Sequence, residues 1–217
     1  MDKLNNDFYN ALDYERSMFG KTDIFYEKWI KNILYASYPW NLMEINLSRW
    51  DWNTPEGRTK QMSDIDITID VDVKSGQIKN HYNISEKFRT DDYGDMFIEL
   101  YSKYPNVNGW GPTTEADLIF YHTPKNLYYI DAKDIKRVSN DIMNTININH
   151  LNDEMVEWGT NRTEREYNGF HLDFIKVPTY VNDKKLWTGI GVCIQWDVLR
   201  KLNVKYEKID KNFVNSL

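Results

Sequence analysis

Polar and apolar residues alternate without a break in the stretch Asp64-Ile65-Asp66-Ile67-Thr68-Ile69-Asp70-Val71-Asp72-Val73. Successive side chains of a β-strand point to opposite faces, so the four aspartates and the threonine would lie on one face and the five β-branched apolar residues on the other. The stretch therefore predicts a strand that buries its apolar face and keeps a face rich in carboxylates.

A hairpin is expected to continue from this strand. Ser75-Gly76 suits a two-residue turn, and a return strand is expected from about Lys79 to Arg89. In the register that this turn sets, Ile67 falls opposite Ile84, and apolar residues meet apolar ones along the pair. The polar face of the hairpin then gathers five residues, namely Asp64, Asp66, Ser85, Lys87 and Arg89.

Other segments predict further strands and helices. Residues 95–102 suit either a third strand or a short helix, and residues 106–114 are expected to form a loop. The other expected elements are two helices within 6–37, separated near Gly20, a connection over 38–57, a second hairpin from 116–122 and 127–132, a helix within 139–158, strands near 171–180 and 186–195, and a helix over 196–202. We therefore predict an α/β (α+β mixed) fold, in which helices flank a central mixed β-sheet.

The length of 217 residues fits one domain, with N-terminal helices in 1–37, a β-rich core in 60–135 and a C-terminal helix and tail in 196–217. Hydrophobic residues make up 41% of the chain, which is enough to build a core. No apolar run approaches the roughly 20 residues that span a bilayer, so we expect a soluble, cytoplasmic protein with no membrane partner. The single cysteine, Cys193, excludes an internal disulfide and a cysteine-rich zinc site.

The formal net charge of -6 bears on possible partners. A protein that coats nucleic acid regardless of sequence is normally basic, so the charge argues against that class. It argues less against an enzyme that acts on nucleic acid, because a site for Mg²⁺ needs carboxylates.

The polar face of the first hairpin has the residue types of a phosphoryl-transfer site. A carboxylate such as Asp66 can hold Mg²⁺, and a neighbouring lysine such as Lys87 can stabilise charge on a phosphoryl oxygen. Glu99 follows soon after and offers a further carboxylate. The same charges are also typical of a solvated sheet face with weak ion pairs, and taken alone they favour that interpretation.

The order of the elements strengthens the first interpretation. The segments Gln61–Ile67, Asn83–Lys87 and Gly94–Leu100, together with Gly109-Trp110 and Ala116–Tyr121, resemble the PD-(D/E)XK nuclease superfamily in a form found in bacteriophage and mobile-element proteins. The resemblance covers residues 56–131 and rests on short motifs. It implies a restriction-endonuclease-like core, Mg²⁺ or Mn²⁺ as cofactor, and DNA as substrate.

Carried onto this sequence, the resemblance implies that Asp66, Lys87 and Glu99 are catalytic. It also implies that Asp66, Glu99 and the backbone carbonyl of Glu86 bind the metal. Ser85 stands where the family has an acidic residue, which is a departure from the motif. Asp64 or Glu99 would then have to supply the missing carboxylate.

A second set, Asp117, Asp131 and Lys133, repeats the pattern of an aspartate followed by Asp-x-Lys. A turn of even length in the second hairpin would put Asp117 opposite Ala132 and direct the other two residues to the opposite face. A loop of odd length would bring the three together. This set therefore stays an alternative site.

Three functions follow as hypotheses. The first is a metal-dependent DNA nuclease of a phage or mobile element, working in the host cytoplasm. The second is a catalytically weak or inactive nuclease-fold protein that binds and inhibits a host protein, as an anti-defence factor would; Ser85 and the acidic net charge motivate it. The third is an assembly protein of a mobile element, which no particular residue supports.

Overall fold

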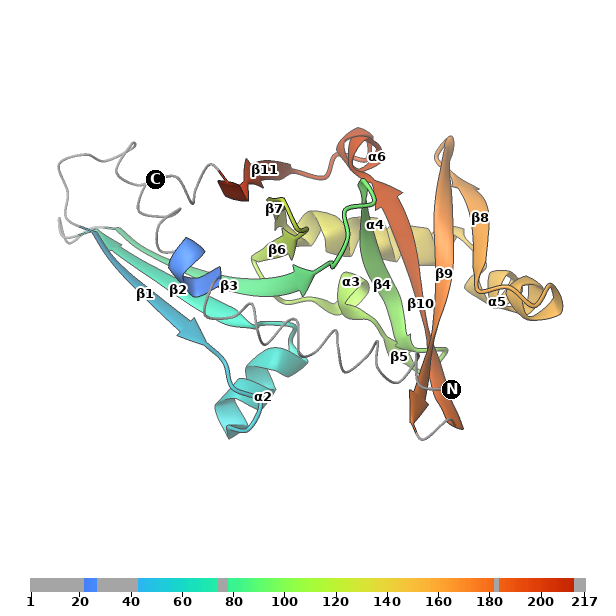
Figure 1. The fold of residues 1–217 in the computed structure, drawn as a ribbon, viewed down its shortest axis with the longest axis horizontal. Helices are drawn as coiled ribbons and strands as arrows, with labels where there is room; N and C mark the ends of the chain where they lie inside the picture. Colours follow the sequence, from blue (N-terminus) through green and yellow to red (C-terminus); the bar gives the residue numbers. More distant parts are fainter. Residues whose placement is uncertain (1–21, 27–42, 74–77, 182–183, 213–217) are drawn as a thin grey trace. The chain divides into compact units, whose positions relative to one another are not determined.

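The computed structural model describes residues 22–26, 43–73, 78–181 and 184–212 of the chain (Figure 1). The chain divides into two compact units built from interleaved segments. The hairpin unit comprises residues 6–92, 115–130 and 207–217, and the second unit comprises residues 1–5, 93–114 and 131–206. The single domain expected from the sequence stays a prediction.

A six-stranded mixed sheet forms the hairpin unit. Its strands β1, β2 and β3 pair antiparallel, whereas β3 and β6 pair parallel. In sheet order the strands are β1 (Met43–Arg49), β2 (Ile67–Val73), β3 (Ile78–Phe88), β6 (Leu118–His122), β7 (Asn126–Asp131) and β11 (Tyr206–Asp210). The mixed α/β class predicted from the sequence is thus confirmed.

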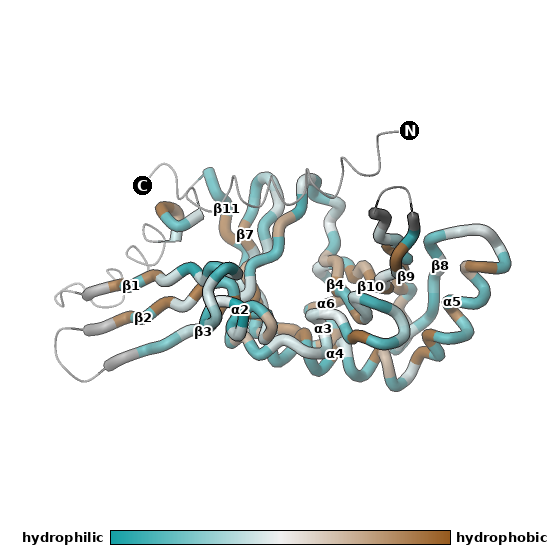
Figure 2. The backbone as a smooth tube through the Cα atoms, turned by 90° about the horizontal axis from the view of Figure 1, so that it is seen from below, coloured by the Kyte–Doolittle hydropathy of each residue, from teal (hydrophilic) through white to brown (hydrophobic). Residues whose placement is uncertain are grey.

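The register of the first hairpin is the predicted one. Ile67 pairs with Ile84, and Ile69 pairs with Tyr82. Hydrophobic and hydrophilic residues follow one another along β1 and β2 in Figure 2, as the period of two requires. The turn expected at Ser75-Gly76 lies outside the described residues.

The strand β2 begins at Ile67, three residues later than predicted. Asp64 has a φ of 59°, in the left-handed region that breaks an extended strand but that aspartate tolerates better than most residues. The chain arrives there from helix α2 (Pro55–Met62), whose last turn ends with a hydrogen bond from Asp64 N to Gln61 O. A helix end therefore sets the direction of the first two aspartates.

The apolar faces of β2 and β3 pack under the helical turn at residues 22–26. Each buried side chain of this size contributes roughly 1.5–3 kcal/mol to folding. The members of this core are Phe25, Tyr26, Ile67, Ile69, Val71, Ile84, Phe120 and Leu127. The rest of the helices expected within 6–37 lies outside the described residues.

An antiparallel five-stranded sheet forms the second unit. Residues 95–103 are a strand, because Met96, Ile98 and Leu100 alternate onto one buried face. In sheet order the strands are β5 (Val107–Asn108), β4 (Asp95–Lys103), β10 (Lys184–Gln195), β9 (Phe170–Val181) and β8 (Arg162–Tyr167). The helices of this unit are α3 (Trp110–Thr113), α4 (Ala132–Thr145), α5 (Ile148–Glu157) and α6 (Trp196–Lys201).

Several elements differ from the sequence predictions. The helix expected within 139–158 is two helices, because Asn147 accepts a hydrogen bond from His150 N and starts α5 there. Strand β1 lies in the expected connection, α3 in the expected loop and β11 in the expected tail, and β8 was not predicted. Within the described ranges, no helix has both the length and the apolar character needed to cross a bilayer.

Candidate functional site

An ion pair joins β3 to the junction between α2 and β2. Lys87 Nζ donates to Asp64 Oδ1 at 2.6 Å, and both side chains are largely buried, at 21% and 15% exposed. Asp64 reaches Lys87 because the α2–β2 junction turns at this residue. The predicted proximity of these two groups is thus present, although Asp64 itself lies outside the strand.

Asp66 contacts the backbone of β3 near this ion pair. Its Oδ2 accepts a hydrogen bond from the backbone N–H of Glu86 at 2.7 Å. Burial raises the pKa of Asp66, the charge of Asp64 raises it further, and the ammonium of Lys87 opposes the rise. The three charged groups are therefore near enough to act on one another.

Two buried oxygen atoms complete the cluster. Ser85 is fully buried on β3, and the Oδ2 atom of Asp64 is buried too. Neither Ser85 Oγ nor Asp64 Oδ2 has a hydrogen-bond partner among the residues that the structure describes. Buried polar atoms are nearly always paired, so these two oxygens call for a partner such as a water molecule or an ion.

Glu86 directs its carboxylate to the opposite side of β3. Its Oε1 accepts from the Tyr26 hydroxyl at 2.6 Å, and its Oε2 is paired with Arg49 Nη1. The carboxylate therefore lies away from Asp64, as the register predicted. The proposed role of its backbone carbonyl as a metal ligand stays a prediction.

Glu99, the third residue of the predicted catalytic set, lies on β4 opposite Gly191. It belongs to the second unit, whereas Asp66 and Lys87 belong to the hairpin unit. Its place in the metal site accordingly stays a prediction.

The residues of the alternative set have local hydrogen-bond partners, and their role as a site stays a prediction. Asp117 Oδ2 accepts from Asn83 N at 2.8 Å in the hairpin unit. Asp131 begins helix α4, where its Oδ1 accepts from Lys133 N at 3.2 Å and its Oδ2 lies 2.8 Å from Lys133 Nζ. The strand thus ends at Asp131, and the Asp-x-Lys pattern here makes a helix cap.

The sequence did not identify three polar residues near the site, the buried Tyr26 and His122 and the partly buried Arg49. Tyr26 OH contacts His122 Nε2, and burial lowers the pKa of His122 and raises the pKa of Tyr26. One signal for this group was present, because Glu86 is the only charged residue among the alternate positions that carry Ile84 and Phe88. A charge on an apolar face requires a buried partner.

No family model, no curated protein and no solved structure matches this chain. In the parts of the chain that the structure describes, no group of three or more His, Cys, Asp or Glu side chains has the arrangement of a metal site. The cluster around Lys87 has two carboxylates and one hydroxyl. It therefore has two of the three His, Cys, Asp or Glu residues that such a group needs, and all of its possible metal ligands are oxygen atoms.

Proposed function

We propose that this chain is a metal-dependent phosphodiesterase that cleaves DNA, of the kind that phages and mobile elements encode. The observation that supports it is the cluster of Asp64, Asp66 and Lys87, in which Asp64 Oδ2 and the neighbouring Ser85 Oγ have no partner among the described residues. Carboxylates beside a lysine are the groups that phosphodiester hydrolysis uses.

The donor set suits a small, hard cation. Mg²⁺ and Mn²⁺ prefer carboxylate and hydroxyl oxygens and are often held by one or two carboxylates. Asp66, Asp64 and Ser85, all of the hairpin unit, would hold the ion. Once bound, the cation would stabilise the negative charge on a phosphoryl oxygen.

Lys87 has a second task in this proposal. Its ammonium group donates to Asp64. A lysine beside Asp66 would stabilise the negative charge that develops on a phosphoryl oxygen. The ion pair also keeps the lysine in place before substrate arrives.

Cleavage of defined DNA tests the proposal. Linear, nicked and branched DNA would be incubated with the protein and Mg²⁺ or Mn²⁺. We expect cleavage that falls at least about 100-fold in Asp66→Ala and in Lys87→Ala, since each removes a group next to the reacting phosphate.

The matched control is Asp70→Ala. Asp70 lies on β2 in an exposed pair with His81, and its loss should leave cleavage within about twofold. Absence of cleavage by the wild type on all three substrates, or cleavage that survives the double variant Asp66→Ala with Lys87→Ala, would refute the nuclease.

The second candidate is a nuclease-fold protein that has lost cleavage and binds a host protein. Ser85 favours it, because the position of the family's acidic residue holds a buried hydroxyl. A folded wild type that binds no Mn²⁺ and captures one host protein in proportion to its own amount would support this candidate. Robust cleavage without such a partner would reject it.

A further inference from the structure

A network of polar groups, of which Tyr26 and Glu86 are buried, lies on the opposite side of β3 from Lys87. Arg49 is the last residue of β1. Its Nη1 contacts Glu86 Oε2, and its Nη2 lies 2.6 Å from Asp23 Oδ1. Tyr26 donates its hydroxyl proton to Glu86 Oε1. We call Tyr26, Arg49 and Glu86 the latch, because they join the helical turn at residues 22–26 to β1 and β3.

The protons of the latch have one consistent arrangement. Tyr26 has a single hydroxyl proton, and it is given to Glu86, so the contact with His122 Nε2 requires the histidine to donate. His122 is then the neutral Nε2–H tautomer, which agrees with the lowering of its pKa by burial. The Glu86 carboxylate therefore has Arg49 as its counter-ion and Tyr26 as its second donor.

Stability alone does not account for the latch. The Glu86 side chain is 1% exposed, and burying an ion pair costs desolvation energy that the attraction often only offsets. Apolar residues of similar volume would fill the same space at no such cost. The arrangement therefore requires a reason that concerns geometry.

The backbone of Glu86 provides this reason. The residue whose carboxylate the latch holds also donates its N–H to Asp66 Oδ2, and its chain neighbours are Ser85 and Lys87. We propose that Glu86 is a positioning residue, whose anchored side chain fixes the segment of β3 that orients the Asp66 carboxylate. In its bearing on metal binding, this inference rests on the proposed function.

The same strand contains an internal control. Asn83 N donates to Asp117 Oδ2 at 2.8 Å, which is also a backbone N–H to carboxylate bond in the hairpin unit. Asn83 has no contact with the latch residues among the hydrogen bonds of the described chain. A change confined to the latch should therefore affect the N–H of Glu86 and spare that of Asn83.

Hydrogen exchange measured by NMR on wild type and Tyr26→Phe tests this without metal or DNA. The variant removes only the hydroxyl and keeps the ring, whose centroid lies 4.9 Å from that of Phe120. We expect exchange at the Glu86 amide to accelerate about tenfold, because one buried bond of the latch is lost, and exchange at the Asn83 amide to change less than about twofold.

Equal acceleration at both amides would indicate general destabilisation and overturn the positioning role, as would no change at either. If Tyr26→Phe does not fold, Arg49→Lys replaces it, because it keeps the positive charge and loses the two-pronged geometry that contacts both Glu86 and Asp23. The same criterion then applies to the same two amides.

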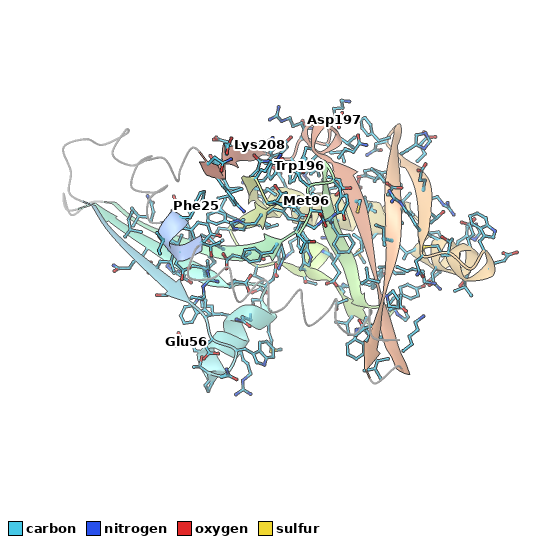
Figure 3. All side chains as sticks on the ribbon, viewed as in Figure 1. Phe25, Glu56, Met96, Trp196, Asp197 and Lys208 are labelled. Carbon is cyan, nitrogen blue, oxygen red and sulfur yellow. The ribbon has the colours of Figure 1, made fainter. Side chains whose placement is uncertain are left out.

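A second measurement connects the latch to the site. Mn²⁺ binding, followed by the electron paramagnetic resonance of the free ion, should weaken about 10- to 100-fold in Glu86→Gln. The matched control is Glu56→Gln, the same chemical change on the exposed side of α2 in the same unit (Figure 3), and it should bind like wild type. If Glu86→Gln binds Mn²⁺ as tightly as the wild type, Glu86 does not position Asp66. If the wild type binds no Mn²⁺, the proposed function is refuted, and the hydrogen-exchange experiment alone decides on the latch.

Discussion

Burial raises the pKa of Asp66 above its ordinary value of 3.8, and the ammonium of Lys87 only partly offsets that rise. The folded state therefore binds the proton of this carboxyl more tightly than the unfolded state does. Below pH 3.8 both states are protonated and the residue costs nothing. As the pH rises through the raised pKa, the buried charge lowers the free energy of unfolding.

Asp66→Asn should accordingly stabilise the protein at neutral pH when no divalent cation is present. The gain should be absent near pH 3.8, grow as the pH rises and level off above the raised pKa. Denaturant unfolding at several pH values in the presence of a chelator measures the gain. Asp70→Asn, at an exposed position on β2, should show no such gain. A loss of stability in Asp66→Asn at neutral pH would contradict the penalty that burial imposes. Residues that a fold would be more stable without are typical of functional sites.

At the scale of elements, the junction of α2 and β2 decides where the site begins. Asp64 has a φ of 59°, which costs a β-branched residue more than it costs asparagine or aspartate. Both Asp64→Asn and Asp64→Val remove the ion pair with Lys87, so the difference between the two variants isolates the backbone. We expect the valine variant to be less stable by about 1–2 kcal/mol, as measured by thermal or denaturant unfolding. Equal stabilities would show that the junction adopts another conformation.

How much of this could be predicted from the sequence depends on the range of the interactions. The pairing of Ile67 with Ile84 was predictable, because a period of two and a short turn leave one register that buries every isoleucine. The left-handed Asp64 was not, because the alternating pattern continues through it while the end of α2 determines its backbone. Arg49 and Glu86 meet across 37 positions of sequence, and no local pattern encodes such a contact.

The position of Glu99 illustrates the same limit. Its alternation with Met96, Ile98 and Leu100 correctly permits a strand, since those three residues fill one buried face. Membership of a second sheet, which pairs β4 with β10 nearly 100 residues later in the chain, follows only from the complete set of strands. Period-two patterns identify a strand and its faces but do not name its neighbours.

At the scale of the whole molecule, the net charge of -6 attracts cations to many weak places, so cation binding alone does not identify a site. A specific site differs because its ligand stabilises the folded chain through particular oxygens. Binding of the ion to the folded state alone adds about 2.7 kcal/mol to the free energy of unfolding at a Mn²⁺ concentration about 100 times the dissociation constant. Thermal unfolding with Mn²⁺, and again after a chelator removes it, measures the gain.

Two variants separate the specific from the general effect of Mn²⁺. Asp66→Asn and Asp70→Asn change the net charge of the molecule by the same amount, but only the first changes the oxygens beside Lys87 and Ser85. We expect the Mn²⁺-dependent gain to persist in Asp70→Asn and to vanish in Asp66→Asn. Without the cation, Asp66→Asn should be more stable than the wild type. Adding Mn²⁺ should stabilise the wild type and leave the stability of Asp66→Asn unchanged. A gain of equal size in both variants would mean that the cation acts on the overall charge. The cluster of Asp64, Asp66 and Lys87 would then be a solvated sheet face with an ion pair.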